Sequence, residues 1–167
     1  MKSMDLLRLS SILALAAWIG GLVALGAVVA PELFAALEAA DPAAGRELAG
    51  RVFGSAFHQF QYLAWAAGVV VLATLGLRAA LGPRPRRLAV RFWTTSAMLA
   101  ASVLATFVIA PAIEAVRLST AGPVASLAAS DPARILFGRL HGASTGLMLF
   151  TIVAGIGLIW AELQDRH

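Results

Sequence analysis

Four long apolar segments, separated by short polar loops, account for nearly the whole chain. They span approximately residues 9–31, 57–80, 88–113 and 137–161. Each has at least twenty residues and few charges, and about 20 apolar residues are what an α-helix needs to cross a bilayer. Because lipid offers no hydrogen bonds, the backbone polar groups of these segments must be satisfied within helices. The pattern predicts an all-α integral membrane protein, a four-helix bundle in which residues 1–167 form a single transmembrane domain.

The composition and the first segment agree with this class of protein. Hydrophobic residues make up 60% of the chain and charged residues 13%, whereas charged residues are about a quarter of an average soluble domain. The first segment is longer than the apolar core of a signal peptide and is not followed by a cleavage pattern, so we expect it to be retained. The chain has no cysteine, which excludes disulfides, thiolate metal sites and cysteine nucleophiles.

Basic residues concentrate around one predicted loop. Arginines from Arg78 to Arg91 flank and fill the segment 81–87, between the second and third spans. Because positive charge is enriched in cytoplasmic loops, we expect this loop and both termini to face the cytoplasm, in the inner membrane of a cell. The cluster predicts contact with the lipid bilayer and its headgroups. A nucleic-acid partner is not expected, since no folded platform supports the cluster.

The two halves of the chain share an ordered set of short motifs. Val-Val-Ala-Pro ends at Pro31, and Val-Ile-Ala-Pro ends at Pro111. In each half Asp-Pro and then Phe-Gly follow, a few residues before a histidine; these motifs are Asp41-Pro42, Phe53-Gly54, Asp131-Pro132 and Phe137-Gly138. The parallel predicts two repeated helical hairpins related by an axis along the membrane normal. Generic loop chemistry is the alternative interpretation.

Each Asp-Pro pair is typical of a helix start, because Asp can cap a helix and Pro fits its first position. After Asp41 we expect a short surface helix over about 43–53, which bends into the second span at Gly50 or Gly54. After Asp131 we expect the helix to continue directly into the fourth span.

Polar side chains recur at helical spacing within three of the spans. The stripe in span four comprises His141, Ser144, Thr145, Met148 and Thr151, and that in span three comprises Arg91, Thr95, Met98, Ser102 and Thr106. In span two, one face carries His58, Gln61, Tyr62 and Trp65. Membrane helices use small and hydroxyl residues to pack and hydrogen-bond to each other, so we interpret the stripes first as bundle interior. A polar pathway is the alternative.

His58 and His141 carry the main functional hypothesis. Both fall in the first turns of spans that enter from the same side, so they should lie at similar depth. Ionisable residues within a membrane usually face the bundle interior and have a partner, and packed helices lie about 8–10 Å apart. We therefore expect the two imidazoles to face each other between spans two and four and to share a ligand.

The chemistry of the two histidines limits the ligand. Two imidazoles suit a haem iron or a copper ion, and copper is favoured over zinc because a structural zinc site needs four protein ligands. We therefore predict haem b or copper, with no cofactor as the alternative, and Glu32 or Glu114 could add a carboxylate. The other residues predicted around the cofactor are Tyr62, Trp65, Ser144 and Met148. Without a cofactor, each histidine would hydrogen-bond a carbonyl, a nearby glutamine or a headgroup.

The function predicted from this site is electron transfer or copper handling, with a redox partner or a second copy of the chain as candidate partners. The alternative is a permease for a small solute or metal ion, or an accessory membrane subunit without a cofactor. No catalytic residue is predicted, because no acid lies in sequence reach to orient a histidine beside the hydroxyls near His141.

Several short motifs resemble a known family. They are Trp18-Ile19-Gly20-Gly21, Val29 to Phe34, Phe53 to His58, and Phe137 to Ser144. Their order is similar to that in a bacterial four-span membrane family of unknown function, which is related to a vertebrate transmembrane protein associated with cisplatin resistance. The resemblance covers essentially the whole chain and implies a four-helix membrane bundle.

More remotely, the chain is similar to copper-resistance D membrane domains and to a haem-binding protoporphyrinogen oxidase of bacteria. Those relatives have a histidine in the first span, a turn or two before the tryptophan, where this chain has Ser10 and Ser11. The resemblance therefore implies the fold and supplies no reaction.

Overall fold

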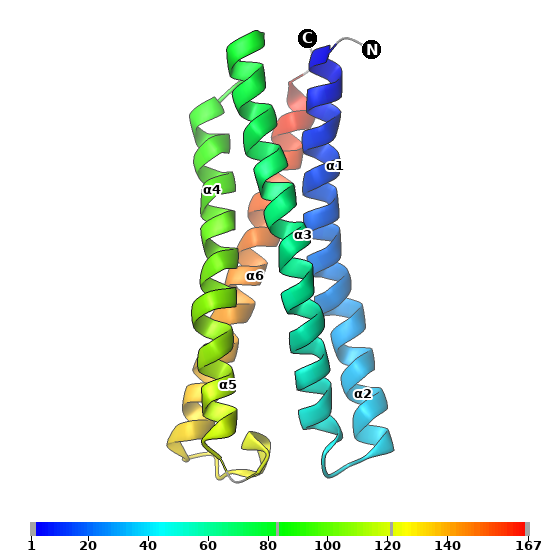
Figure 1. The fold of residues 1–167 in the computed structure, drawn as a ribbon, viewed down its shortest axis with the longest axis vertical. Helices are drawn as coiled ribbons and strands as arrows, with labels where there is room; N and C mark the ends of the chain where they lie inside the picture. The colour runs from blue at the N-terminus through cyan, green and yellow to red at the C-terminus, as the bar shows by residue number, and fades with distance from the viewer. Residues whose placement is uncertain (1–2, 83, 121, 166–167) are drawn as a thin grey trace.

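The computed structural model describes residues 3–82, 84–120 and 122–165, and over these ranges it is mostly helical. Four long helical rods run back and forth along the molecule (Figure 1). Each is 31 to 37 residues long and apolar enough to cross a membrane. The elements are α1 (Ser3–Ala24), η1 (Leu25–Val29), α2 (Ala30–Ala40), α3 (Gly45–Leu81), α4 (Leu88–Leu104), η2 (Ala105–Ile109), α5 (Ala110–Leu118), η3 (Val124–Ser126) and α6 (Pro132–Gln164). The prediction of an all-α membrane bundle is confirmed.

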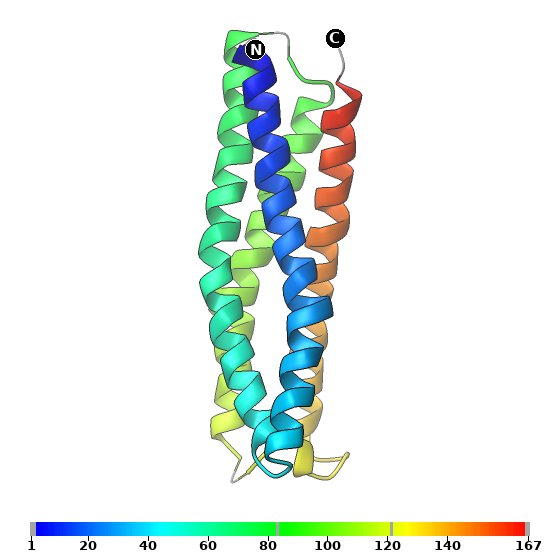
Figure 2. The same cartoon turned by 90° about the vertical axis from the view of Figure 1, so that its right-hand side faces the viewer.

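The rods form a four-cornered bundle. α1 packs against α3 and α6, and α4 packs against the same two helices, so α1 and α4 lie on one diagonal. The two chain ends and the α3–α4 loop lie together at what we call the terminal end, and the other two connections lie at the distal end (Figures 1 and 2). The two hairpins, α1 with α3 and α4 with α6, therefore point the same way, as the repeat predicts.

The core is narrow and runs along the bundle axis. Its largest fully buried side chains are Leu15 and Trp18 of α1, Leu75 of α3 and Met98 of α4. At Gly21 the first and second rods approach closely, because a Cβ there would collide with the ring of Phe60 of α3. Many large apolar side chains lie on the outside, which suits a surface covered by lipid instead of water.

The start of α3 differs from the prediction. No bend occurs at Gly50 or Gly54, and α3 is one continuous helix from Gly45. Asp41 accepts hydrogen bonds from two backbone N–H groups, those of Ala43 and Ala44, so the turn is completed before the helix begins. The helix can then start at Gly45, where a Cβ would collide with the backbone of the preceding rod.

The start of α6 agrees with the prediction. Asp131 accepts a hydrogen bond of 2.8 Å from the N–H of Ala133, and α6 runs unbroken from Pro132 to Gln164. Proline is favoured at this first helical position, because the N–H that it lacks would have had no partner within the helix.

Spans one and three were predicted over about 9–31 and 88–113, and the helices continue through Pro31 and Pro111, to Ala40 and Leu118. Just before each proline the helix widens into a π turn, in which Ala30 donates to the carbonyl of Leu25 and Ala110 to that of Ala105. A proline in an α-helix lacks an N–H and its ring clashes with the carbonyl four residues back. The π turn relieves both problems without ending the helix.

The π turns also support the internal repeat. When Pro31 is aligned with Pro111, the five residues of η1 fall on the five of η2. The same alignment pairs buried positions of α1 with buried positions of α4, namely Ser11 with Arg91, Leu15 with Thr95, and Trp18 with Met98. The repeat therefore preserves both the inward face and the irregular turn of the helix, which generic loop chemistry does not explain.

Candidate functional site

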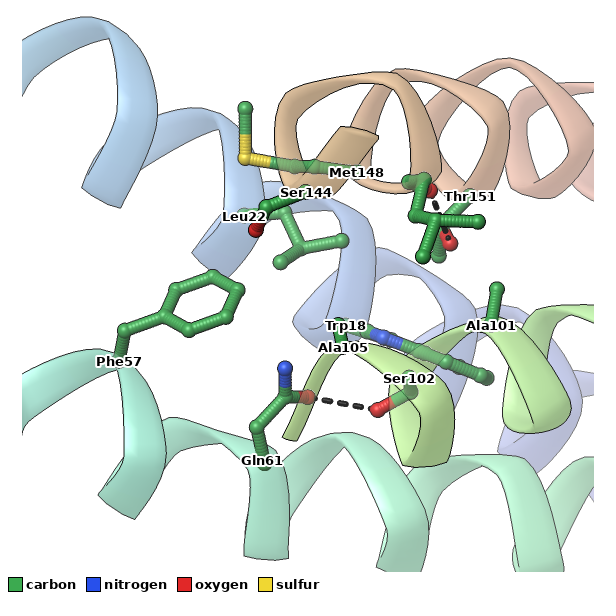
Figure 3. Close-up of a pocket in the computed structure, with 11 residues that line it drawn as sticks. Trp18, Leu22, Phe57, Gln61, Ala101, Ser102, Ala105, Ser144, Met148 and Thr151 are labelled. Atoms are coloured by element: carbon green, nitrogen blue, oxygen red, sulfur yellow. Dashed lines mark hydrogen bonds between the residues drawn. The ribbon is translucent and has the colours of Figure 1, made fainter. Parts of the chain in front are cut away.

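A small cavity lies at the centre of the bundle, between all four rods. Its volume is about 20 Å³, room for about one water molecule. The lining residues are Trp18 and Leu22 of α1, Phe57 and Gln61 of α3, Ala101 and Ser102 of α4, Ala105 of η2, and Ser144, Leu147, Met148 and Thr151 of α6. Figure 3 shows most of these side chains converging from four helices on one space.

A hydrogen-bond chain joins α3 to α4 beside this cavity. The indole N–H of Trp65 donates to the hydroxyl of Ser102 at 2.9 Å, and Ser102 donates to Oε1 of Gln61 at 2.7 Å. Indole N–H can only donate, so the Ser102 hydroxyl accepts from it and uses its own hydrogen for Gln61. The carbonyl oxygen of Gln61 is thereby used, and its amide nitrogen points into the cavity (Figure 3).

On the α6 side of the cavity, the polar groups are weaker or already have a hydrogen-bond partner. The Thr151 hydroxyl donates to the carbonyl of Leu147 at 2.9 Å. Ser144 is half-buried at the cavity edge. The methyl group of Met148 lies 3.2 Å from where a Cβ on Gly26 would be, so its thioether side chain packs against the bare backbone of η1. The cavity therefore has one strongly polar group turned towards it, the amide of Gln61.

The six residues predicted to surround a cofactor fall into separate groups. Ser144 and Met148 line the central cavity. His58, Tyr62 and Trp65 form a row of edge-to-face contacts on α3, with ring centroids 5.7 and 5.4 Å apart. Trp65 also stacks on Phe107 of η2 at 5.5 Å. His141 stacks on Phe137 of its own helix at 6.1 Å.

The expectation that both histidines face the bundle interior is wrong. His58 and His141 are both exposed, so neither ring is enclosed by the bundle. On α3, Phe57 takes the inward position and lines the cavity. Since successive helix residues are rotated by about 100°, the next residue, His58, turns away. On α6, His141 lies beyond Ser144 towards the distal end, where its ring stacks on that of Phe137.

These positions do not fit a haem or metal ion shared by two imidazoles inside one bundle. The central cavity holds about one water, which is far less than a porphyrin needs. Among the described residues, no group of three or more His, Asp or Glu side chains could hold a metal ion. Glu32 and Glu114 are both exposed. Binding of haem b or copper stays a prediction from the sequence.

The polar stripes have mixed outcomes. All five residues predicted for span three are buried, so that stripe is the inward face of α4 and η2. In span two, Gln61 is buried, whereas His58 and Tyr62 are exposed. In span four, Thr151 is buried, Ser144 and Met148 are half-buried, and the remaining two are exposed. The inward faces therefore converge at the centre of the bundle and diverge towards the distal end.

Sequence reasoning missed a buried ion cluster at the terminal end. Arg78 of α3 contacts Glu162 at 2.7 Å and Asp165 at 3.2 Å. Arg91 of α4 contacts the same two acids at 3.0 and 2.8 Å. All four side chains are at most 5% exposed, and their charges cancel.

A signal for this cluster was present in the sequence. Glu162 and Asp165 are spaced three apart at the end of the last span, which places them on one helix face. They lie at the same end of the bundle as Arg78 of the second span and Arg91 of the third. Counting Arg78 and Arg91 with the basic cluster around the loop, as a signal for lipid headgroups, concealed the pairing.

Four membrane-length apolar helices, packed as two similar hairpins around a polar centre, define an integral membrane four-helix bundle. Residues 13–122 match the family described as a domain of unknown function (DUF4149). The match covers well over half of the chain, so the protein belongs to that family. No curated protein and no solved structure matches the chain.

The resemblances to the cisplatin-resistance-associated protein and to copper-resistance D domains stay predictions. The chain's own structure accounts for the first-span position where those relatives carry a histidine. Here Ser11 is fully buried and shares a hydrogen bond with Thr74 of α3. The pair ties α1 to α3 next to the core.

Proposed function

We propose that the protein is a permease, which binds a small hydrogen-bonding solute at the centre of the bundle and lets it cross. The observation that carries this proposal is the placement of the two π turns. Ala105 of η2 lines the central cavity, and Gly26 of η1 packs against Met148, which lines it too. Interrupted helices at corresponding places of two repeats are a recurring feature of solute sites in transporters.

The polar chemistry of the cavity supports a neutral solute. Gln61 is 3% exposed and offers amide N–H groups, while Ser144 adds a hydroxyl at the edge. An ion would need compensating charge, and no charged side chain lines this cavity. The cavity of about 20 Å³ has room for about one water, so passage of a larger solute requires the rods to separate. In a π turn the backbone hydrogen bonds join residues five apart instead of four, so the helix is already irregular there. We assign the two π turns as the hinges about which the rods separate.

Solute flux into proteoliposomes tests the proposal. Stopped-flow light scattering would compare the uptake of water, urea and glycerol by vesicles with and without the purified protein. Replacing Gln61 with leucine removes the buried amide, and we expect the protein-dependent flux of urea or glycerol to fall about tenfold, the effect of losing one buried hydrogen bond to the solute.

Gln59→Leu is the matched control, because Gln59 is the same residue type on the same helix but is exposed. Its flux should equal that of the wild type. Equal flux in protein-containing and empty vesicles for all three solutes would refute the permease proposal.

We also propose that the terminal end faces the cytoplasm of a cell inner membrane. Arg84, Arg86 and Arg87 are exposed at this end, and positive charge in short loops sets the orientation of membrane proteins. A cysteine placed at Ser126 of the distal end, labelled in whole cells by a membrane-impermeant maleimide, tests this orientation. If the cysteine is labelled only after the cells are broken, the distal end faces the cytoplasm and the proposed orientation is wrong.

A further inference from the structure

A second hollow lies between α4 and α6 at the terminal end, and it shares no lining residue with the central cavity. It is a groove of about 670 Å³. Its polar wall includes Arg86, Arg87, Arg91 and Asp165, and its apolar wall includes Val90, Ala154, Gly157, Leu158 and Trp160. The groove therefore changes from charged to apolar along its length.

The charged part of the groove carries uncompensated positive charge. Arg91 and Asp165 neutralise each other within the ion cluster, at 2.8 Å. Arg86 and Arg87 are exposed, and neither forms an ion pair within the described residues. Two guanidinium groups at the mouth thus remain available to an anion, which Arg binds by paired N–H donors.

The backbone and one buried side chain add to this preference. Arg87 has a φ of 55°, and α4 begins immediately after it with no side chain capping its first N–H groups. The positive end of the helix therefore faces the mouth of the groove. In the groove wall Arg91 is 4% exposed, and its Nε–H has no acceptor among the described residues.

The apolar part of the groove selects the kind of anion. Ala154, Gly157 and Ala161 line the groove and recur at helical spacing along one face of α6, and small residues leave a trough beside the helix. Trp160 is 64% exposed at the same level, where amphipathic rings lie at membrane interfaces. An occupant that joins an anionic head to a hydrocarbon chain fits both halves of the groove, whereas a free phosphate fits only the mouth.

We propose that this groove binds an anionic phospholipid, whose phosphodiester lies at Arg86 and Arg87 and whose acyl chain lies along the small residues of α6. Basic pockets between membrane helices bind anionic headgroups in this way. The proposal concerns the outer surface of the bundle and is independent of the permease proposed above.

Titration of the purified full-length protein with phosphatidylglycerol or phosphatidylcholine, followed by native mass spectrometry, tests the proposal. We expect phosphatidylglycerol to bind at least tenfold more tightly than phosphatidylcholine. Arg86→Gln and Arg87→Gln should each weaken phosphatidylglycerol binding by about fivefold. Arg84→Gln removes the same charge from the same loop outside the groove, and it should change binding by less than twofold.

The apolar half has its own pair of variants. A Cβ at Gly157 meets nothing within 4 Å, so Gly157→Leu fills the trough without disturbing the bundle and should weaken phosphatidylglycerol binding severalfold. Gly76→Leu is the control, because Gly76 also has open space around it and lies on α3, away from the groove. Thermal unfolding of each variant verifies that it folds.

Three outcomes would overturn the proposal. The first is equal affinity for the two lipids. The second is an equal loss of binding in the Arg84, Arg86 and Arg87 variants. That result would mean that the overall positive charge of the loop, and not the groove, attracts the lipid. The third is that inorganic phosphate competes with phosphatidylglycerol while Gly157→Leu still binds the lipid fully. That result would mean that the mouth of the groove binds a soluble anion.

Discussion

Arg78 of α3 and Glu162 of α6 are separated by 84 residues and joined by a buried ion pair of 2.7 Å. With Arg91 and Asp165 they form a neutral cluster of four charges, which joins α3, α4 and α6 at the terminal end. Charges at membrane depth are tolerated when they pair with one another. The cluster therefore fixes how the last helix is placed against the second and third rods.

Removing one acid from this cluster should destabilise the protein strongly. Glu162→Gln leaves Arg78 and Arg91 with one carboxylate between them, and breaking a buried ion pair costs about 3–5 kcal/mol. Unfolding in a mixed detergent series, followed by circular dichroism, measures this loss. Glu38→Gln is the control, because Glu38 pairs with Arg46 on the surface, with side-chain exposures of 38% and 65%. Exposed pairs contribute about 0–1 kcal/mol, so equal losses in both variants would contradict the role assigned to the cluster.

Two adjacent glycines should respond differently to the same substitution. Gly21→Ala places a methyl group against the ring of Phe60, whereas a Cβ at Gly20 meets nothing within 4 Å. Overpacking of a core costs about 1–3 kcal/mol, so Gly21→Ala should lower the free energy of unfolding by that amount. Gly20→Ala should leave it unchanged or raise it slightly, because alanine favours helix. The reverse order would mean that α1 presents a different face to α3.

Replacing the proline that follows a π turn should raise the free energy of unfolding and lower the flux of solute through the protein. Pro31→Ala restores a backbone N–H and removes the ring that forces the turn, so the helix can become regular. We expect the free energy of unfolding to rise by about 1–3 kcal/mol, and protein-dependent solute flux to fall severalfold if η1 acts as a hinge. Pro132→Ala is the control, because Pro132 starts α6 and no π turn precedes it. Unchanged flux in Pro31→Ala would remove the hinge role.

The two membrane histidines should be dispensable for folding. His58 and His141 are exposed, and surface substitutions usually change stability by at most about 0.5 kcal/mol. The variant with both replaced by alanine should therefore unfold like the wild type and show the same visible absorption spectrum. A Soret band or bound copper in the wild type that disappears in this variant would favour the haem or copper prediction over the permease.

The sequence was sufficient to predict the solvent, the number of helices and their common orientation. Length and apolarity determine these features, because a bilayer permits few other structures. The inward face of α4 was also predictable, since the residues of the stripe from Arg91 to Thr106 follow helical spacing and all are buried. Pro31 and Pro111 were recognised as equivalent, but the π turns before them were not predicted. A proline removes one backbone hydrogen bond, and one sequence does not reveal how the preceding turn accommodates that loss.

The candidate site was predicted less well, for a related reason. Helical spacing places His58 and Gln61 on one side of α3, but it does not determine where the boundary between interior and lipid falls. Packing puts Phe57 and Gln61 inside and leaves His58 outside. The ion cluster was missed because its partners lie on three helices, and the pairing of distant charges requires knowing which helix ends meet. The bundle itself supplies that information.

The order of the four charges along the chain bears on how the protein is made. Arg78 and Arg91 are synthesised before Glu162 and Asp165, so the first three spans leave the ribosome with two cations that have no counter-ion. Unpaired cations resist translocation across the membrane. Arg78 and Arg91 would therefore hold the newly synthesised spans in one orientation during insertion. When the last span arrives, its acids neutralise them. In the orientation proposed above, the same arginines would direct the insertion of the chain and then complete its tertiary structure.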